Sequence, residues 1–316
     1  MKSSTVCFTG HRPSKLSFKY NENHPQCLLL KQRLKTRIID AIENGYHRFF
    51  TGMAIGVDTW AAEAVLELKE KYPLIKLLAA VPCTQQEKTW PRASKERYHR
   101  ILNACDEVHQ VSDQPYSAKR MLDRDQYMVD RSQRIIAVYN GKPGGTAHTI
   151  QRAKESQLVI DAIHPETPPQ TLECSSKGDK RFSAFSAYVS AFGMPGSIET
   201  HYQLSKRFGE AAPPKTIKAV KGKTPSHMAL NGQELPIRFL TPWYKLLWVK
   251  YLDKNPDLVS YARSYDIFQD AFSGKSVNVQ SDVIRQYAQE GRRSLWNDCH
   301  ELIEILKGEE KNYEQS

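Results

Sequence analysis

The sequence lacks long apolar runs and lacks any cysteine pattern typical of a metal site. No stretch of eighteen or more apolar residues occurs, which excludes a membrane-spanning helix. The first ten residues contain no apolar core of a signal peptide, so we expect a cytoplasmic protein with no membrane partner. The six cysteines are scattered, without Cys-x-x-Cys pairs or zinc-ligand spacing to histidine. We therefore expect no metal, no disulfide framework and no cofactor.

Acidic residues are few relative to basic ones. The 45 lysines and arginines exceed the 35 aspartates and glutamates, which gives a net charge of +10 and a pI near 9.2. A basic balance favours phosphorylated ligands or polyanions, although the same residues also form ordinary solvated surfaces. Nucleic acid is one candidate partner, but no base-reading motif supports it. The 316 residues suffice for two domains, and no internal repeat is present.

The first half of the chain alternates short apolar runs with stripes of helical period. The expected strands span residues 5–9, 47–50, 76–81, 106–111, 134–139 and 158–163. Between the first two, Leu30, Leu34, Ile38 and Ile42 fall on one face of an expected helix. Such alternation is typical of a parallel sheet covered by helices on both faces. Ligands of these sheets bind beyond the carboxyl ends of the strands.

A glycine-rich turn at residues 141–146 follows the fifth expected strand and precedes a helix expected from Thr149. A strand, a glycine-rich turn and a helix together aim backbone N–H groups and the positive helix end at a phosphate. Alone, the turn is equally well explained as a tight connection. Three more polar loops, at residues 10–12, 52–58 and 82–90, belong to the same sheet edge and favour a nucleotide site. In the last loop, Trp90 is either a core residue or a platform for a base.

The expected nucleotide-binding residues come from three of these loops. They are Gly10, His11, Arg12, Gly52, Gly56, Asp58, Gly144, Gly145, Thr146 and Thr149. The glycines let the backbone approach a ligand, and an arginine directly after a strand is well placed for a phosphate or carboxylate. Asp58 is either a ribose-hydroxyl acceptor or an ordinary first-turn acid of a helix.

These motifs resemble the SLOG superfamily, and within it the bacterial and phage branch that opens with Gly-His-Arg-Pro. The resemblance covers residues 4–165 and rests on residues 10–13, 51–58 and 142–149. It implies a Rossmann-like, nucleotide-binding domain related to the Lonely Guy enzymes. Those enzymes carry Pro-Gly-Gly-x-Gly-Thr-x-x-Glu with a catalytic glutamate, whereas this sequence continues after Gly145 as Thr-Ala-His-Thr-Ile-Gln. Binding is therefore at least as good an expectation for this domain as hydrolysis.

The second half of the chain differs from the first in the spacing of its apolar residues, which is mostly helical, and in composition. Residues 166–180 are rich in proline, serine and charged side chains and are expected to be a linker. Residues 181–316 are expected to form a smaller, mainly α-helical domain. The expected helices span 197–208 with Ser197 as N-cap, begin at Thr241-Pro242 and at Asn255-Pro256, span 281–289, and begin at Ser294.

Parts of this second half resemble, at a distance, the NADAR family, whose members cleave N-glycosidic bonds in riboflavin-pathway intermediates or in ADP-ribose attached to guanine. The resemblance covers residues 180–306 and rests on Phe-Ser-Ala-Phe at 182–185 and Ser-x-Glu-x-x-Tyr-Gln-x-x-Lys at 197–206. It implies Glu199 as the catalytic carboxylate, which stabilises oxocarbenium charge or orients water. The expected pocket consists of Phe182, Phe185, Tyr202, Lys206 and Trp243, with the polar stretch 276–282 beside it.

Each of these residues also has a structural interpretation. Glu199 is a first-turn acid favoured by the helix dipole, and Tyr202 and Trp243 occupy helical positions that are usually core. The sequence thus predicts hydrolysis of an N-glycosidic bond in the second domain, with a nucleotide or ADP-ribose-like ligand in the first. The alternatives are a non-catalytic sensor or sequestering protein in bacterial–phage conflict, and a phosphoribohydrolase in the first domain. We expect a homo-oligomer.

Overall fold

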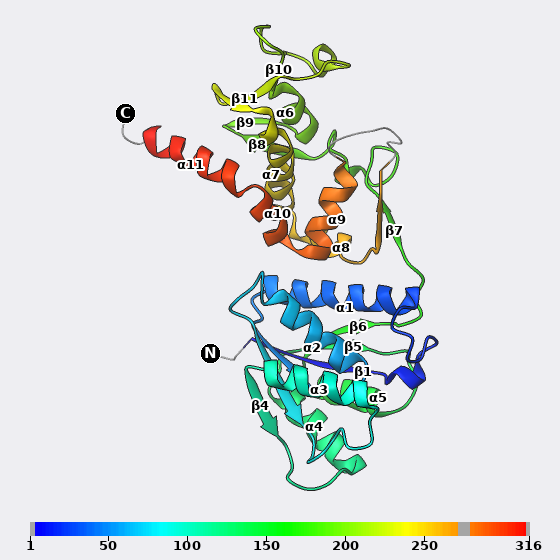
Figure 1. The fold of residues 1–316 in the computed structure, drawn as a ribbon. Coiled ribbons are helices and arrows are strands. Elements are labelled where there is room, and N and C mark those ends of the chain that lie inside the picture. Colours follow the sequence, from blue (N-terminus) through cyan, green and yellow to red (C-terminus); the bar gives the residue numbers. More distant parts are fainter. Residues whose placement is uncertain (1–3, 271–278, 314–316) are drawn as a thin grey trace. The chain divides into compact units, whose positions relative to one another are not determined.

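The computed structural model describes residues 4–270 and 279–313. The chain divides into two compact units, the first comprising residues 1–168 and the second residues 169–316 (Figure 1). Within the described ranges, none of the helices combines the length and the apolar character that crossing a bilayer requires.

The first unit is built on a six-stranded, all-parallel sheet, as predicted (Figure 1). Its strands are β1 (Thr5–Gly10), β2 (Arg48–Thr51), β3 (Lys76–Val81), β4 (Glu107–Gln110), β5 (Arg134–Val138) and β6 (Val159–Ile163). Their order across the sheet is β4-β3-β2-β1-β5-β6. The chain therefore moves outward from β1 to β4 and then returns to place β5 on the other side of β1. This confirms the Rossmann-like fold class.

Helices cover both faces of this sheet and explain why β3 and β5 are nearly continuous apolar runs, whereas the edge strand β4 is exposed. The helices are α1 (Pro25–Glu43), α2 (Val57–Leu68), α3 (Arg92–Ala104), α4 (Ala118–Asp130) and α5 (Gly145–Glu155), with a 3-10 turn at Pro13–Lys15. Alternate residues of β1 belong to different clusters: Val6 and Phe8 pack with α1, α2 and α3, and Cys7 packs with α4 and α5. The predicted stripe of Leu30, Leu34 and Ile38 lies fully in the first of these clusters.

The glycine-rich turn differs from the prediction in one respect. Helix α5 begins at Gly145, four residues before the expected start at Thr149. Gly144 is its N-cap with φ of +151°, a conformation that favours glycine over residues with a side chain. The turn therefore passes directly into the first helical turn, and the start of the helix lies within the motif itself.

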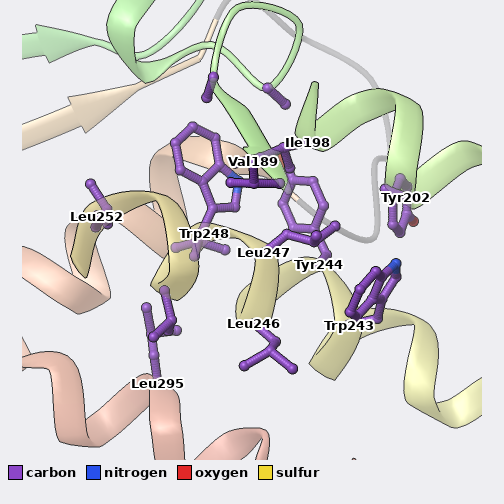
Figure 2. Packing of buried hydrophobic residues seen from close by; sticks show 14 of the residues in the cluster. Val189, Ile198, Tyr202, Trp243, Tyr244, Leu246, Leu247, Trp248, Leu252 and Leu295 are labelled. Carbon is purple, nitrogen blue, oxygen red and sulfur yellow. The ribbon is translucent and has the colours of Figure 1, made fainter. Parts of the chain in front are cut away.

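The second unit is mainly helical, with short strands around the helices. Its helices are α6 (Ile198–Leu204), α7 (Leu240–Asp253), α8 (Pro256–Ala262), α9 (Gln280–Glu290), α10 (Arg292–Asp298) and α11 (His300–Tyr313), with 3-10 turns at Lys180–Phe182, Ile217–Val220 and Ile237–Phe239. The strand pairs are β7 (Thr171–Glu173) with β13 (Ile267–Gln269), β8 (Tyr188–Ala191) with β9 (Met194–Ser197), and β10 (Lys206–Arg207) with β11 (His227–Leu230), which also pairs with β12 (Gln233–Pro236). Helix α7 supplies much of the core, and Figure 2 shows its Tyr244 and Trp248 beside Val189 and Ile198.

Several element boundaries in the second unit differ from the sequence expectations. Helix α6 ends at Leu204 rather than at residue 208, because Lys206 and Arg207 pair with β11. Ser294 lies inside α10, so the last predicted helix is instead two helices that meet at Cys299. The stretch 166–180 contains β7, since Leu172 and Cys174 are buried in the core of this unit.

Two predicted helix starts are confirmed, and one differs slightly. Oγ of Ser197 accepts a hydrogen bond from the backbone N–H of Thr200 at 3.1 Å, the expected N-cap of α6. Asn255 occupies the N-cap position of α8 without a capping hydrogen bond from its side chain, and Pro256 occupies the first position of the helix. Helix α7 begins at Leu240, one residue before the helix start expected at Thr241-Pro242.

Candidate functional site

The order of the strands creates a crevice between β1 and β5. The loop after β1 leads toward β2 and the loop after β5 leads toward β6, so the two loops diverge at the carboxyl end of the sheet. This topological switch point is where open α/β sheets bind ligands. A cavity of about 380 Å³ lies there. Its lining includes six of the predicted residues, namely Gly10, His11, Arg12, Asp58, Gly145 and Thr146.

The start of α5 gives this cavity an anion-binding character. The backbone N–H of His148 donates to the carbonyl of Gly144 at 3.0 Å, which is the first intrahelical bond. The N–H groups of Gly145, Thr146 and Ala147 have no acceptor within the described part of the chain. Such first-turn amides carry the positive end of the helix dipole. Their natural partner is an anion in the cavity.

Two cationic side chains of the 10–15 loop strengthen that character. Arg12 and Lys15 are both exposed and both line the cavity. The Lys15 ammonium lies beside Gly144, where a Cβ on that residue would come within 3.2 Å of Nζ. The absence of a side chain at position 144 therefore lets a lysine approach the start of α5.

A buried ion cluster lies at the cavity wall formed by α2 and α4. Arg124 is 5% exposed and Asp58 is 6% exposed. Nη1 of Arg124 lies 3.3 Å from Oδ2 of Asp58, and its Nε lies 2.8 Å from Oδ1 of Asp125. Burial raises the pKa of Asp58 to about 6, and Arg124 only partly opposes this rise. Two carboxylates around one guanidinium thus leave Asp58 as an acceptor that titrates close to neutral pH.

Gly52 supports this cluster instead of lining the cavity. A Cβ at position 52 would lie 1.6 Å from Nη1 of Arg124, so only glycine leaves space for the guanidinium. Nη1 also donates a hydrogen bond to the backbone carbonyl of Gly52. The sequence expectation of a direct ligand contact by Gly52 is therefore replaced by a supporting role.

Gly56 and Thr149 also stand behind the cavity. Gly56 is the N-cap of α2, and Asp58 belongs to the first turn of that helix. Oγ1 of Thr149 lies 3.0 Å from Oδ2 of Asp125 and 2.9 Å from the carbonyl of Gly145, and the residue is fully buried. Its hydroxyl is committed to these acceptors and holds Asp125 in place.

His11 connects the loops that follow β1 and β5. Its ring is buried, and Nε2 lies 2.6 Å from Oδ1 of Asn140. Burial lowers the pKa of His11, and the nearby Lys15 and Lys142 lower it further, while Asn140 acts in the opposite direction. The ring is therefore uncharged at neutral pH and fixes the spacing of the two loops that bound the crevice.

The fourth predicted loop lines a second, adjoining cavity of about 670 Å³. Residues 84–86 and 88–90 form one side of it, and Pro115 and Tyr116 form another. Arg12, Tyr116 and Met121 line both cavities, so the two are neighbours. Trp90 is half-buried, with its ring edge-on to Tyr98 at a centroid distance of 5.5 Å. It combines both interpretations left open above, since it packs on the core and lines a cavity.

The sequence reasoning missed Arg124, Asp125, Lys15 and Tyr116. Arg124 had a usable signal, because it lies three residues after Met121 and four before Met128, on one face of α4. A charged residue within an apolar stripe is rarely buried unless it is paired. Lys15 and Tyr116 belong to irregular loops and carried no such pattern.

In the second unit, Glu199 belongs to a short polar chain along α6. Its Oε1 accepts a hydrogen bond from Nε2 of Gln203 at 2.8 Å, and Oε1 of Gln203 accepts one from Nζ of Lys206 at 2.8 Å. The Lys206 ammonium lies 4.4 Å from the ring centroid of Tyr202. Burial lowers the pKa of Lys206, and Glu199 opposes this shift. Glu199, Tyr202 and Lys206 are therefore close together at α6, and their role as a pocket stays a prediction.

Of the other predicted pocket residues, Trp243 reaches α6, where its Nε1 donates a hydrogen bond to the carbonyl of His201 at 3.4 Å, but the three differ in burial. Phe182 is fully buried and stacks on Tyr261, while Trp243 is 1% exposed and stacks on Phe192. Figure 2 shows Trp243 on α7 within the packed core. Phe185 is 50% exposed. Two core residues and one surface residue do not form a common pocket wall, because burial fixes the first two. Of the polar stretch 276–282, residues 276–278 lie outside the described residues. Gln280 is buried, and its Oε1 accepts a hydrogen bond from the backbone N–H of Ala184 at 2.7 Å.

No cluster of three or more histidine, cysteine, aspartate or glutamate side chains suited to a metal ion occurs in residues 4–270 and 279–313. The carboxylates that line the cavity at the switch point are Asp58 and Asp125. Both are engaged with Arg124. The donor set at this site therefore suits an anion or a hydroxyl-bearing ligand.

Comparison with known proteins relates the first half of the chain to bacterial proteins. The model of the YspA SLOG family matches residues 6–167. A UPF0398 protein of Halalkalibacterium halodurans is 32% identical over 154 residues, which cover 48% of this chain and 81% of that protein. The SPbeta prophage-derived protein YoqJ of Bacillus subtilis is 37% identical over 158 residues, which cover 45% of this chain and 92% of that protein. The similarity to these relatives thus concerns less than half of the chain.

Two solved structures are more distantly similar. DNA processing protein A from Helicobacter pylori, which binds single-stranded DNA, is 17% identical and matches 51% of this chain and 65% of its own, with a TM-score of 0.37. DNA processing protein A from Streptococcus pneumoniae is 20% identical and matches 52% of this chain and 51% of its own, also with a TM-score of 0.37. At this level of similarity the two proteins do not indicate a ligand for this chain.

Proposed function

The chain belongs to the YspA SLOG family, and we propose that its first unit binds a phosphate-bearing, nucleotide-class ligand in the cavity between β1 and β5. One observation carries the proposal: the unpaired N–H groups at the start of α5 and the cations of Arg12 and Lys15 belong to the same cavity. Aligned amides and cations around one crevice are the usual means of holding a phosphate.

The carboxylates of the cavity suit the remainder of such a ligand. Asp58 and Asp125 are acceptors, and a ribose presents hydroxyl donors next to its phosphate. The carboxylates lie on α2 and α4, whereas the amides and cations come from α5 and the 10–15 loop. A ligand with a phosphate at one end and hydroxyl groups beside it would bind both the amides and cations and the carboxylates. Inorganic phosphate alone would bind only the amides and cations.

Calorimetric titration of the full chain with adenosine 5′-monophosphate and with ADP-ribose tests this proposal. The informative variant is Gly145→Asp, because a Cβ at position 145 meets no atom within 4 Å and the fold is preserved. A carboxylate at the start of α5 should weaken binding by roughly 100-fold, since it competes with the phosphate for the same amides. Asn103→Asp, an equal charge change at an exposed position of α3, should bind normally. Unchanged binding by Gly145→Asp would contradict the site.

Binding without turnover is the form of this function that the sequence favours in the first unit, because the glutamate of the Lonely Guy motif is missing. Hydrolysis would have to use Asp58 or Asp125 instead. Recovery of the bound nucleotide intact after prolonged incubation supports a sensing or sequestering role. One relative is prophage-derived, in keeping with a role in bacterial–phage conflict. Release of free base from adenosine 5′-monophosphate would instead indicate a phosphoribohydrolase.

A second candidate function, hydrolysis of an N-glycosidic bond by the second unit, draws support from the polar chain on α6. Glu199 is only half-buried, and Gln203 and the partly desolvated Lys206 orient it. A carboxylate so held can stabilise an oxocarbenium-like transition state or a water molecule. The test is release of ADP-ribose from ADP-ribosylated guanine substrates. Glu199→Gln should abolish release, whereas Glu210→Gln, an exposed control, should not. Full activity of Glu199→Gln would contradict this role.

A further inference from the structure

We propose that the second cavity of the first unit receives the base of the same ligand, and that Gln86 recognises an amino group on that base. The inference rests on the proposed function of the first cavity and adds the chemical group bound beside it. The two cavities share Arg12, Tyr116 and Met121 in their linings. A ligand anchored by its phosphate at α5 therefore extends past Arg12 into a space of about 670 Å³, within the range typical of small-molecule sites.

Gln86 provides the observation that points to a ligand in this second cavity. Its side chain lines the cavity and is only 7% exposed. Nε2 donates to the backbone carbonyl of Gly52 at 3.4 Å, which fixes the orientation of the amide. Oε1 is buried and has no donor among residues 4–270 and 279–313. A buried acceptor without a partner is unfavourable, and buried polar groups of native proteins are normally paired.

An N–H or O–H donor that enters the cavity lined by Gln86 would supply the missing partner of Oε1. The amino groups of adenine, guanine and cytosine are such donors, and each lies on the edge of a flat aromatic ring. Gly52 connects this position to the first cavity, because its carbonyl also accepts a hydrogen bond from Arg124, the partner of Asp58. The carbonyl of Gly52 thus accepts hydrogen bonds from both Gln86, which would face the base, and Arg124, whose partner Asp58 would face the ribose.

The aromatic residues of the second cavity suit a base. Trp90 is anchored edge-on against Tyr98, and Tyr116 is 62% exposed at the boundary of the two cavities. Stacking on such rings stabilises bound bases irrespective of their identity. Identity would then depend on Gln86, since stacking alone does not distinguish an amino group from a carbonyl. Trp90 and Tyr116 would therefore supply affinity for any base, and Gln86 would supply the preference for a base with an amino group.

The experiment compares four probes on the full chain: ribose 5-phosphate and the 5′-monophosphates of adenosine, cytidine and uridine. Binding is followed by calorimetry and by tryptophan fluorescence. We expect the better of the two amino-bearing nucleotides to bind about tenfold more tightly than uridine 5′-monophosphate and still more tightly than ribose 5-phosphate. In Gln86→Met, which keeps the length of the side chain without the acceptor, the preference should disappear. Binding of ribose 5-phosphate should be unchanged, which also shows that the variant is folded.

The outcomes distinguish this inference from the function on which it rests. If ribose 5-phosphate binds and the nucleotides bind no more tightly, the base does not enter the second cavity and only the inference fails. If Gln86→Met retains the full preference for an amino-bearing base, Gln86 is not its acceptor. If none of the four probes binds, the proposed function and the inference fail together.

Discussion

In the first unit, residues from loops far apart in the sequence line one cavity, whereas in the second unit the two aromatic residues of one sequence motif are separated, one into the core and one onto the surface. Arg12, Asp58 and Gly145 lie more than forty residues apart from one another yet share a cavity at the edge of the sheet. Phe182 and Phe185 lie three residues apart, but one is fully buried and the other is half exposed.

The difference follows from how the two kinds of element position a residue. In a parallel sheet, every loop that follows a strand is delivered to the same edge, so the topology gathers the loops whatever their spacing in sequence. On a helix, the direction of a side chain depends on which face is buried, and that face is fixed by packing partners elsewhere in the chain. Strand-end motifs are therefore the better guide to a site.

The largest expected effect concerns the core of the second unit. Trp243→Ala should destabilise that unit by about 3–5 kcal/mol, the range for removing a large buried aromatic side chain. Hydrogen exchange of α7, followed by mass spectrometry of the full chain, measures this directly. Phe185→Ala, from the same motif but half exposed, should change exchange very little. Normal protection of α7 in Trp243→Ala would show that Trp243 is a pocket residue after all and would remove the contrast between the units.

The ion cluster of the first unit gives the next largest effect. Arg124→Ala leaves Asp58 and Asp125 buried without their common cation and should lower the free energy of unfolding by about 3 kcal/mol. Urea unfolding at pH 7 measures the change. Arg92→Ala is the control, because its side chain is 93% exposed. A loss similar to that of the control would show that the cluster contributes nothing to the rigidity of the cavity.

A substitution at Gly52 tests the same ion cluster in a second way. Gly52→Ala should be strongly destabilising alone, because its Cβ would meet the Arg124 guanidinium, and much less so in the Arg124→Ala background. Equal effects in both backgrounds would contradict the supporting role assigned to Gly52.

A smaller effect is expected from the titration of Asp58. Because burial raises its pKa from 3.8 to about 6, the folded chain binds this proton more tightly than the unfolded chain does. Its contribution to stability is fully present below pH 4 and is lost as the pH rises through about 6. Asp58→Asn should remove a pH dependence of roughly 1–3 kcal/mol across this window. Urea unfolding between pH 4 and pH 7.5 measures it, with Asp123→Asn, an exposed acid of α4, as the control. If the free energy of unfolding of Asp58→Asn depended on pH as that of the unaltered chain does, a group other than Asp58 would be responsible for the dependence.

The smallest effect is expected at Glu199. Glu199→Gln should change the free energy of unfolding by less than about 0.5 kcal/mol, since Gln203 and Lys206 are partly exposed and retain each other. Binding of adenosine 5′-monophosphate by the first unit should be unchanged. Calorimetry and urea unfolding of the same sample check both points. A large destabilisation would identify Glu199 as a structural residue of α6 rather than a candidate catalytic one.

The sequence predicted the sheet of the first unit well because two-sided burial makes inner strands such as β3 and β5 nearly continuous apolar runs. It located Gly10, Arg12, Asp58 and Gly145 because each follows a strand or begins a helix. It missed Arg124, whose partners lie on two other elements, and it assigned ligand contacts to Gly52 and Thr149, which hold Arg124 and Asp125 instead. In the second unit, Ser197 and Asn255 carried local capping signals that hold, whereas the burial of Trp243 depends on partners distant in the sequence. The homo-oligomeric state and the roles of the candidate residues stay predictions.

The most direct test of the nucleotide site is the behaviour of three backbone amides in a ligand titration followed by two-dimensional NMR of the full chain. The N–H groups of Gly145, Thr146 and Ala147 lack an acceptor within the described residues. If they hold the phosphate of adenosine 5′-monophosphate, their proton resonances should move strongly downfield and saturate together with the binding isotherm. Binding that leaves these three resonances unshifted would contradict the site, whatever its affinity.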